Sequence, residues 1–343
     1  MIFEQLAVGG CQSYVLGCPE TFSGVIIDPE VQLIDRYRAI AAREGLTIRY
    51  VVDTHTHADH FSASRQLGAV LDAPVVMHCE CPEPFVDLRL DDGNSLIVGT
   101  LRMIVLHTPG HTRDSMCLVV NDRVFTGDTL LIGGTGRTDL PTGDPNALYD
   151  SLFNKLLKLD PALLVFPAHD YKGRGQSTIA AELADNPRLQ KHDRAAFVDM
   201  MQHLNLSAPT HLTEALRINM SGAKSVSQLL TEAARSVAFI GLGELNSQVE
   251  RRLNDLIVLD VREKDAFSAG HIPTARNLPR GQLELRVNEE FPDPTMRIAV
   301  YCEFGKISTL AAATLRELGF LRATALDGGM KAWRESGLPV EKV

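Results

Sequence analysis

Short apolar runs alternate with amphipathic stretches through the first half of the chain. The runs have the length and β-branched character of strands, and the stretches between them repeat their apolar residues at helical spacing. The strand-like runs lie at 47–52, 74–78, 96–107, 116–120, 123–126 and 163–166. The run 96–107 is long enough for a hairpin or two short strands, and Asn121-Asp122 offers a two-residue turn. This alternation predicts an α/β fold.

Two helices are predicted in the same half, at 62–71 and at 146–159. Asp144 is expected to cap the second helix, with Pro145 in its first turn, where the missing N–H costs nothing. The apolar face of this helix would carry Leu148, Leu152, Leu156 and Leu159. After about residue 188 the pattern becomes helical and polar, and the signal is weak over 215–224.

A second α/β unit is predicted to begin near Val237. It has buried-type strands at 256–261 and 297–301 and a helix at 308–318 that Gly319 ends. We therefore expect two domains, 1–222 and 237–343, joined by a linker at 223–236. Two domains also suit a length of 343 residues, because a single core rarely grows that large.

Composition excludes several classes of function. The chain is 45% hydrophobic and 22% charged, with a net charge of -9, so it lacks the basic surface that binding to nucleic acid or an anionic membrane requires. No apolar run is long enough to span a bilayer, and the first residues lack the pattern of a signal peptide. We expect a cytoplasmic protein, and the sequence leaves open whether it forms a homo-oligomer.

The six cysteines are spread too widely for a disulfide framework, which belongs to short secreted chains. We expect them to be reduced. All except Cys302 are interpreted as inert, small core residues.

Histidine and aspartate gather directly after the predicted strands. The segment 54–60 places His55, His57, Asp59 and His60 within seven residues, and His111, Asp128 and His169 each follow a later run. Loops at one edge of a sheet can bring such side chains to a single cation. Any one of them alone could be an ordinary hydrogen-bonding loop residue, but the set predicts a metal site.

These seven residues resemble the signature of the metallo-β-lactamase fold, over about residues 1–222. The resemblance implies a four-layer αββα sandwich with its metal site at the edges of the two sheets. It does not fix the chemistry. A full ligand set can hold two zinc ions, with Asp128 bridging them, and activate water for hydrolysis.

Within this superfamily, the segments 54–60, 134–139 and 167–171 look like those of the persulfide dioxygenases, the relatives of glyoxalase II. The resemblance implies one Fe(II) per chain, held by His55, His111 and Asp128. Two imidazoles and a carboxylate form the facial triad that leaves positions open on ferrous iron. The implied reaction oxidises glutathione persulfide with O2 to sulfite and glutathione.

The same resemblance suggests roles for the neighbouring side chains. Arg137 would bind a carboxylate of glutathione, and Tyr171 would donate a hydrogen bond to the same ligand. The remaining members of the cluster would orient the ligands or bind a second ion: His57, Asp59, His60 and His169. The alternative is a dinuclear zinc hydrolase of a glutathione thioester. It ranks lower because the C-terminal helical domain of glyoxalase II is replaced here.

Cys302 lies between a predicted buried strand and a predicted helix. Backbone N–H groups at a helix N-terminus create positive potential, which favours the thiolate. The segments 260–263, 270–273, 277–279 and 326–333 resemble the rhodanese family in order, through residues 237–343. The resemblance implies an α/β domain with a parallel sheet. Cys302 would carry sulfane sulfur as a persulfide and exchange it between thiosulfate, glutathione and sulfite.

The loop after this cysteine would form the sulfur cradle, from Glu303, Phe304, Gly305, Lys306, Ile307 and Ser308. Ile307 stands where the family commonly has arginine, and Glu303 adds a negative charge beside the nucleophile. Both make the loop less attractive to thiosulfate or sulfite, although Lys306 offsets part of this effect. The alternative is a non-enzymatic persulfide carrier or sensor domain. The direction of transfer is not determined by the sequence.

Overall fold

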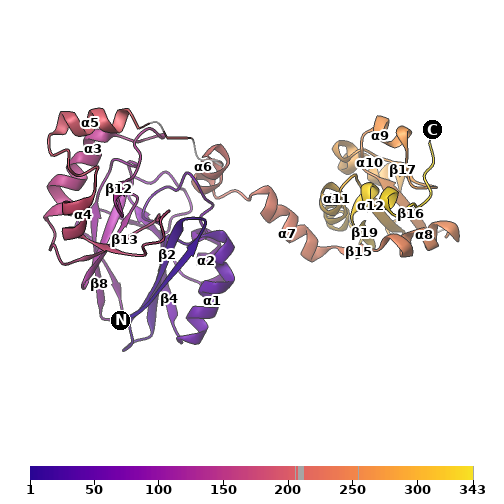
Figure 1. The fold of residues 1–343 in the computed structure, drawn as a ribbon. Helices are drawn as coiled ribbons and strands as arrows, with labels where there is room; N and C mark the ends of the chain where they lie inside the picture. The colour runs from indigo at the N-terminus through magenta and orange to yellow at the C-terminus, as the bar shows by residue number, and fades with distance from the viewer. Residues whose placement is uncertain (205, 208–211, 254, 343) are drawn as a thin grey trace. The chain divides into compact units, whose positions relative to one another are not determined.

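The computed structural model describes residues 1–204, 206–207, 212–253 and 255–342. They form two compact units, Met1–Ala223 and Lys224–Val343 (Figure 1).

The first unit is built on two six-stranded sheets. In the first sheet, β1 to β3 pair antiparallel and β3 to β6 pair parallel. The second sheet has the order β14-β13-β10-β9-β8-β7, in which only β10 and β13 are parallel. The strands are β1 Ile2–Val8, β2 Cys11–Gly17, β3 Ser23–Ile27, β4 Thr47–Val52, β5 Val75–His78, β6 Leu88–Leu90, β7 Ser95–Val98, β8 Leu101–His107, β9 Met116–Val120, β10 Arg123–Gly127, β13 Leu164–Pro167 and β14 Ser177–Thr178, with β11 Leu130–Leu131 and β12 Gly134–Thr135 as a separate pair.

Helices cover the outer faces of both sheets, which gives the expected αββα order of layers (Figure 1). A central core of apolar side chains from both sheets, including Tyr14, Val52, Phe125 and Phe166, fills the space between them. Separate clusters lie under α1 and α2 on one side and under α3 to α5 on the other. The helices are α1 Ile34–Arg43, α2 Ser64–Leu71, α3 Pro145–Tyr149, α4 Ile179–Asp185, α5 Arg194–Gln202 and α6 Leu212–Ser221, with a 3-10 turn η1 at Val31–Leu33.

The predicted helix at 146–159 begins as expected but is not a single α-helix. The carboxylate of Asp144 accepts hydrogen bonds from the amides of Asn146 and Ala147, and Pro145 occupies the first turn. The chain then continues as a π-helix at Asp150–Lys155 and a 3-10 turn at Leu156–Lys158. The wider turn accompanies a hydrogen bond from the hydroxyl of Ser151 to the carbonyl of Pro109, which ties this segment to the loop carrying His111.

The second unit is a five-stranded sheet of order β15-β19-β18-β16-β17, and every pair in it is parallel. Two apolar clusters, one on each face, bury it between helices. The strands are β15 Ala238–Ile240, β16 Leu256–Asp260, β17 Arg276–Asn277, β18 Arg297–Tyr301 and β19 Ala323–Leu326. The helices are α7 Val226–Ser236, α8 Leu242–Glu250, α9 Lys264–Ala269, α10 Leu283–Glu290, α11 Lys306–Glu317 and α12 Gly329–Glu335, with a 3-10 turn η4 at Arg280–Gln282.

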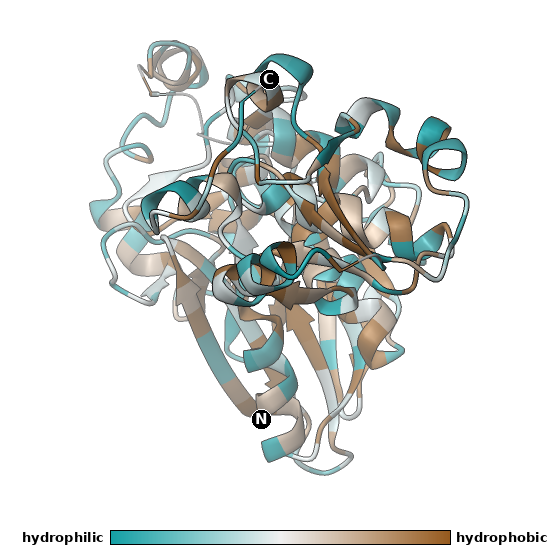
Figure 2. Cartoon of the chain, turned by 90° about the vertical axis from the view of Figure 1, so that its right-hand side faces the viewer, coloured by the Kyte–Doolittle hydropathy of each residue, from teal (hydrophilic) through white to brown (hydrophobic). Residues whose placement is uncertain are grey.

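The segment expected to be a linker contains helix α7. Ser225 and Gln228 form a capping box at its N-terminus, and the helix packs against α11 of the second unit. Figure 2 colours the strands largely brown and the helices in bands of teal and brown, as expected for helices that bury one face. Among the described residues, no helix has both the length and the apolar composition that crossing a bilayer requires.

Candidate metal centre and reactive cysteine

Three of the predicted ligands meet at the edges of the two sheets. His55 follows β4, His111 lies in the loop after β8, and Asp128 follows β10. One ligand atom of each lies within 4.8 Å of the others, and all three residues are buried. This is a compact set of two imidazoles and one carboxylate.

Hydrogen bonds to the protein leave one nitrogen of each imidazole free to bind a metal. His111 Nδ1 donates to the carbonyl of Arg137 at 2.8 Å. His55 Nδ1 lies 3.0 Å from Thr54 Oγ1, whose own hydroxyl donates to Asp28. Both rings therefore carry their proton on Nδ1, and both Nε2 atoms keep a lone pair. His111 Nε2 lies 3.6 Å from Asp128 Oδ2, where a cation would sit between them.

The charge states also suit metal binding. Burial holds the pKa of His55 well below its usual value, so this imidazole is neutral. Burial opposes ionisation of Asp128, but the neighbouring His169, His111 and His55 outweigh it and keep the pKa of Asp128 well below its usual range. The neutral imidazole of His55 and the ionised carboxylate of Asp128 suit a divalent cation, and with His111 they fit the metal site expected from the sequence.

The structure separates Asp59, His60 and His169 into a second cluster beside the first. The ring of His169 bridges two carboxylates, with Nδ1 at 2.7 Å from Asp128 and Nε2 at 2.7 Å from Asp59. Burial lowers the pKa of His169, but these two carboxylates raise it well above its usual value. In this arrangement His169 fixes the orientation of Asp128.

Cys11 completes the second cluster, which was not expected from the sequence. Its Sγ lies 3.5 Å from His169 Nε2, and one ligand atom each of Cys11, Asp59, His60 and His169 lie within 4.8 Å of one another. Burial raises the pKa of Cys11, but His169 and His60 outweigh this and lower it to about 7. The interpretation of Cys11 as a core residue is therefore wrong, because it is only partly buried and belongs to this cluster. Cys11 is far from His169 in the sequence, and an antiparallel β-bridge between the two residues brings Cys11 to the site.

His57 lies between Asp28 and Asp53, and its ring packs against those of His55 and His60, with both centroid distances 4.2 Å. Its Nε2 is 3.4 Å from Asp28 and 3.7 Å from Asp53, and within the described part of the chain neither ring nitrogen has a hydrogen-bond partner. Burial lowers the pKa of His57, but the two carboxylates raise it well above its usual value. Sequence reasoning missed Asp28 and Asp53. Both directly follow a buried strand, the signal that identified the other acids.

Asn219 of α6 is a further supporting residue that the sequence did not reveal. Its side-chain amide donates to the carbonyls of His57 and His60, both at 2.8 Å, and its oxygen accepts from the amide of Ser62. It therefore fixes the loop that carries four of the seven predicted residues.

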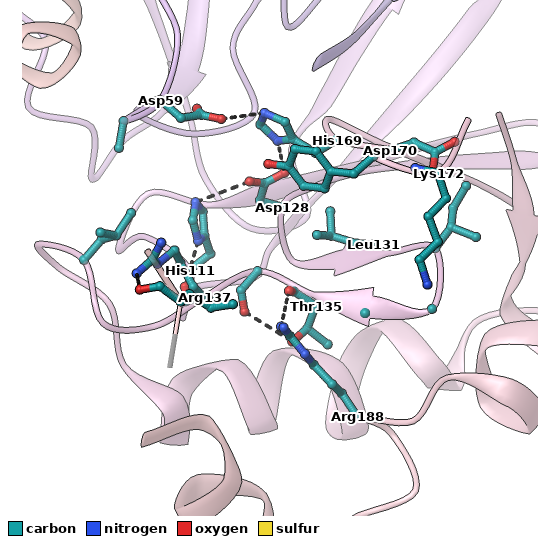
Figure 3. Close-up of a pocket in the computed structure, with 18 of the residues that line it drawn as sticks. Asp59, His111, Asp128, Leu131, Thr135, Arg137, His169, Asp170, Lys172 and Arg188 are labelled. Atoms are coloured by element: carbon teal, nitrogen blue, oxygen red, sulfur yellow. Dashed lines mark hydrogen bonds and ion pairs between the residues drawn. The ribbon is translucent and has the colours of Figure 1, made fainter. Parts of the chain in front are cut away.

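A cavity of about 690 Å³ opens beside the metal-ligand set (Figure 3). His111, Asp128 and His169 line one end, and the cationic side chains of Lys172 and Arg188 lie along the rest of its wall. The cavity also includes both residues predicted to bind substrate, Arg137 and Tyr171.

Arg137 and Tyr171 differ in how free they are to bind a ligand. The guanidinium of Arg137 bonds both oxygens of Asp139, at 2.6 and 2.7 Å, and also the carbonyl of Ser207. The ring of Tyr171 stacks on that of His169, with centroids 5.5 Å apart, while 72% of the residue is exposed. Arg137 already has a carboxylate partner, so Tyr171 is the more available contact.

In the second unit, Cys302 lies at the end of β18 and before α11. The amide of Ser308 donates to Cys302 Sγ at 3.3 Å, and the thiol lies 3.4 Å from Ser308 Oγ. Gly305, at φ +87°, turns the loop into the helix. The cysteine is only 3% exposed, so its sulfur lies at the base of this loop.

Glu303 does not present a free negative charge beside the nucleophile, contrary to the expectation from the sequence. Its carboxylate pairs with Arg262 at 3.1 Å and with Arg334 of α12. Arg262 in turn bonds Asp260, which is fully buried. Asp260 and Arg262 thus have a structural role, and Arg262 also compensates the charge of the cradle loop through its pairing with Glu303.

Comparison with known proteins agrees with these two sites. The metallo-beta-lactamase superfamily matches residues 7–169, and the rhodanese-like domain matches residues 244–336. The chain is 37% identical over 210 residues to the human mitochondrial persulfide dioxygenase ETHE1, covering 61% of this chain and 82% of that protein.

Solved structures give the same picture. ETHE1 from Myxococcus xanthus is 40% identical, with a TM-score of 0.64, over 65% of this chain and all of that one. A metallo-beta-lactamase from Staphylococcus aureus, 22% identical with a TM-score of 0.62, covers 95% of this chain and 98% of that one, and shows a shared fold alone. The chain therefore belongs to the persulfide dioxygenase family of the metallo-β-lactamase superfamily, and it carries a rhodanese domain after the dioxygenase-like unit.

Proposed function

We propose that the first unit is an Fe(II)-dependent dioxygenase that converts glutathione persulfide, O2 and water into glutathione, sulfite and two protons. The observation that carries this proposal is the compact, buried set of His55, His111 and Asp128, two of whose members, His111 and Asp128, line a large cavity. These two imidazoles and one carboxylate would hold the iron, and a site with only three protein ligands would keep positions open for both reactants.

Bound ferrous iron would supply the redox chemistry that lets dioxygen react with a persulfide. The protein would hold the substrate and the ligands in place. Nδ1 of His169 donates to Asp128 and fixes the orientation of that carboxylate. Tyr171, stacked on His169, is placed to donate a hydrogen bond from its hydroxyl to the glutathione moiety. Lys172 and Arg188 place two cationic groups on the cavity wall, each of which would pair with a carboxylate of the ligand.

For the second unit we propose sulfur transfer through a persulfide on Cys302, between thiosulfate, glutathione and sulfite. The Ser308 amide, which donates to Cys302 Sγ, stabilises negative charge on that sulfur. Fusing the two units would keep the product of one close to the acceptor of the other. A cytoplasmic location stays a prediction from the sequence.

The test of the first activity is metal analysis of protein produced with both iron and zinc available, combined with oxygen uptake on glutathione persulfide. We expect about one iron per chain and persulfide-dependent oxygen uptake. His111→Ala should lose both, since it removes one of three ligands. His192→Ala, which changes an exposed histidine of the same unit, should retain both.

The rival function is a dinuclear zinc hydrolase of a glutathione thioester. The cluster of Cys11, Asp59, His60 and His169 favours it, because these residues could hold a second ion. Two zinc ions per chain, hydrolysis of the thioester and no oxygen uptake would establish this rival and refute the dioxygenase.

The carrier alternative for the second unit needs its own assay. A carrier would accept one sulfur atom on Cys302 without turning over, whereas a transferase would turn over and lose that turnover in Cys302→Ser.

A further inference from the structure

Cys302 is buried, whereas the loop and first helical turn that follow it carry two exposed apolar side chains. Cys302 is 3% exposed, while Phe304 is 66% exposed and Ile307 is 51% exposed. Both belong to the loop and first helical turn that surround the thiol. We call Phe304, Ile307 and the loop that carries them the mouth of the Cys302 site. Exposed aromatic and branched side chains near a buried nucleophile suit a carbon-bearing ligand.

The charged residues around this mouth cancel one another. Asp260, Arg262, Glu303 and Arg334 form a chain of ion pairs with two carboxylates and two guanidiniums, so the group has no net charge. Both guanidiniums already have carboxylate partners and are not free to bind an oxyanion. Among the described residues, Lys306 has no ion-pair partner, but it is exposed and lies between Phe304 and Ile307 in sequence.

Two kinds of sulfur donor differ in what they need from such a mouth. Thiosulfate places two negative charges next to the sulfur that it transfers, so its sulfonate must be desolvated beside Cys302. A carbon-bound persulfide, R–S–SH, places a methylene group next to its inner sulfur, and its carboxylates are several bonds away. The methylene gains from contact with Phe304 and Ile307, whereas the sulfonate does not.

We infer that Cys302 exchanges sulfur with carbon-bound persulfides and thiols in preference to thiosulfate and sulfite. The inference deepens the sulfur transfer proposed for this unit and rests on it. The Cys302 thiolate attacks the outer sulfur of R–S–SH, a new S–S bond forms, and the old S–S bond breaks with its electron pair on the leaving thiolate R–S⁻. No net oxidation occurs. Sulfur transfer from thiosulfate to Cys302 releases sulfite, and the reverse reaction is attack of sulfite on the Cys302 persulfide. Both directions pass through the same transition state, so surroundings that disfavour thiosulfate as a donor also disfavour sulfite as an acceptor.

The test measures loading of Cys302 in the full-length protein by intact mass, as the addition of one sulfur atom. Glutathione persulfide and thiosulfate serve as donors, without oxygen so that the first unit does not consume the persulfide. Cys302→Ser gives the loading of other cysteines, which is subtracted. We expect wild-type protein to load from the persulfide at least about tenfold faster than from thiosulfate.

Ile307→Arg adds a guanidinium at the mouth and removes one of its two apolar side chains, so it should accelerate loading from thiosulfate about tenfold and slow loading from the persulfide. Ile307→Gln has no charge and separates the guanidinium from the loss of the apolar side chain. Leu321→Arg adds the same charge beyond the far end of α11, at an exposed leucine, and should change neither rate.

Equal loading of the wild type from both donors, or faster loading from thiosulfate, would overturn the inference while leaving sulfur transfer in place. An Ile307→Arg variant with no gain toward thiosulfate would also overturn it. Absence of loading from either donor would remove the proposed sulfur transfer itself, and the inference with it.

Discussion

At the scale of single residues, the hydroxyl of Thr56 determines that one of two neighbouring carboxyl groups is protonated. Thr56 Oγ1 lies 2.7 Å from Glu83 and 2.8 Å from Asp114, and all three residues are buried. A hydroxyl has one hydrogen, so Thr56 donates a hydrogen bond to only one of the two carboxyl groups. The other carboxyl group must itself be protonated and donate to Thr56 Oγ1. Burial raises the pKa of Glu83 to about 7, with a further increase from the charge of Asp114, so Glu83 is the group that holds this proton.

This proton makes the stability of the first unit depend on pH. The folded pKa of Glu83 is above the unfolded value, so the folded state binds more protons between pH 4.5 and 7. Its free energy of unfolding therefore falls as the pH rises through that window, by an amount on the order of 3 kcal/mol. In Glu83→Gln this contribution disappears. We expect the variant to gain stability relative to wild type as the pH rises from about 5 to about 7.5.

Calorimetry of the first unit at several pH values checks this expectation. Glu80→Gln, at an exposed position in the same loop, is the matched control and should track the wild type. If the difference in free energy of unfolding between Glu83→Gln and wild type does not change with pH, Glu83 is ionised over the whole range measured.

At the scale of elements, helix α7 depends on its capping box because only one of its residues, Ala233, is buried. The Ser225 hydroxyl accepts from the amide of Gln228, and the Gln228 side chain accepts from the amide of Ser225. These two bonds satisfy amides that have no partner within the helix. With so little apolar burial, the cap supplies a large share of the stability of α7.

Ser225→Ala should destabilise the second unit by about 1 kcal/mol, because the cap is lost and α7 packs against α11. Trp333 is the sole tryptophan of the chain and is fully buried in the second unit, so its fluorescence follows the unfolding of that unit. Ser227→Ala makes the same change at an exposed position inside α7. It should leave the free energy of unfolding of the second unit within about 0.5 kcal/mol of the wild-type value. Equal effects of the two substitutions would argue against the capping role.

At the scale of the whole molecule, each chemical site belongs to a unit with its own core. The metal-ligand set is made entirely within Met1–Ala223, and Cys302 and its ion-pair partners lie entirely within Lys224–Val343. Sites built from separate cores do not share the contacts that would couple them energetically.

We therefore expect the two activities to fail independently. His111→Ala should abolish oxygen uptake and leave sulfur loading of Cys302 within about twofold of wild type, and Cys302→Ser should do the reverse. The two assays on each variant, with circular dichroism to verify folding, provide the measurement. Loss of both activities in a folded single variant would mean that the two sites are coupled.

The sequence by itself determined the fold class, nine of the nineteen strands that the structure describes and the residue types of both sites. Strand periodicity placed β4 at its observed bounds, and the asparagine-aspartate turn correctly separated β9 from β10. These features are local, because alternation, turn chemistry and helix caps act over a few residues. The same locality explains why Asp144 and Pro145 were predicted to begin a helix whose later π-turn was not foreseen.

Only the tertiary structure decided how the seven predicted residues divide among three clusters and which distant residues join them. Cys11 reaches His169 across the sequence, Asp28 and Asp53 flank His57, and Arg334 pairs with Glu303. Each of these contacts joins residues that no local pattern connects. Their charge states follow from burial and from partners brought together by folding, so they exist only once the sheets have packed.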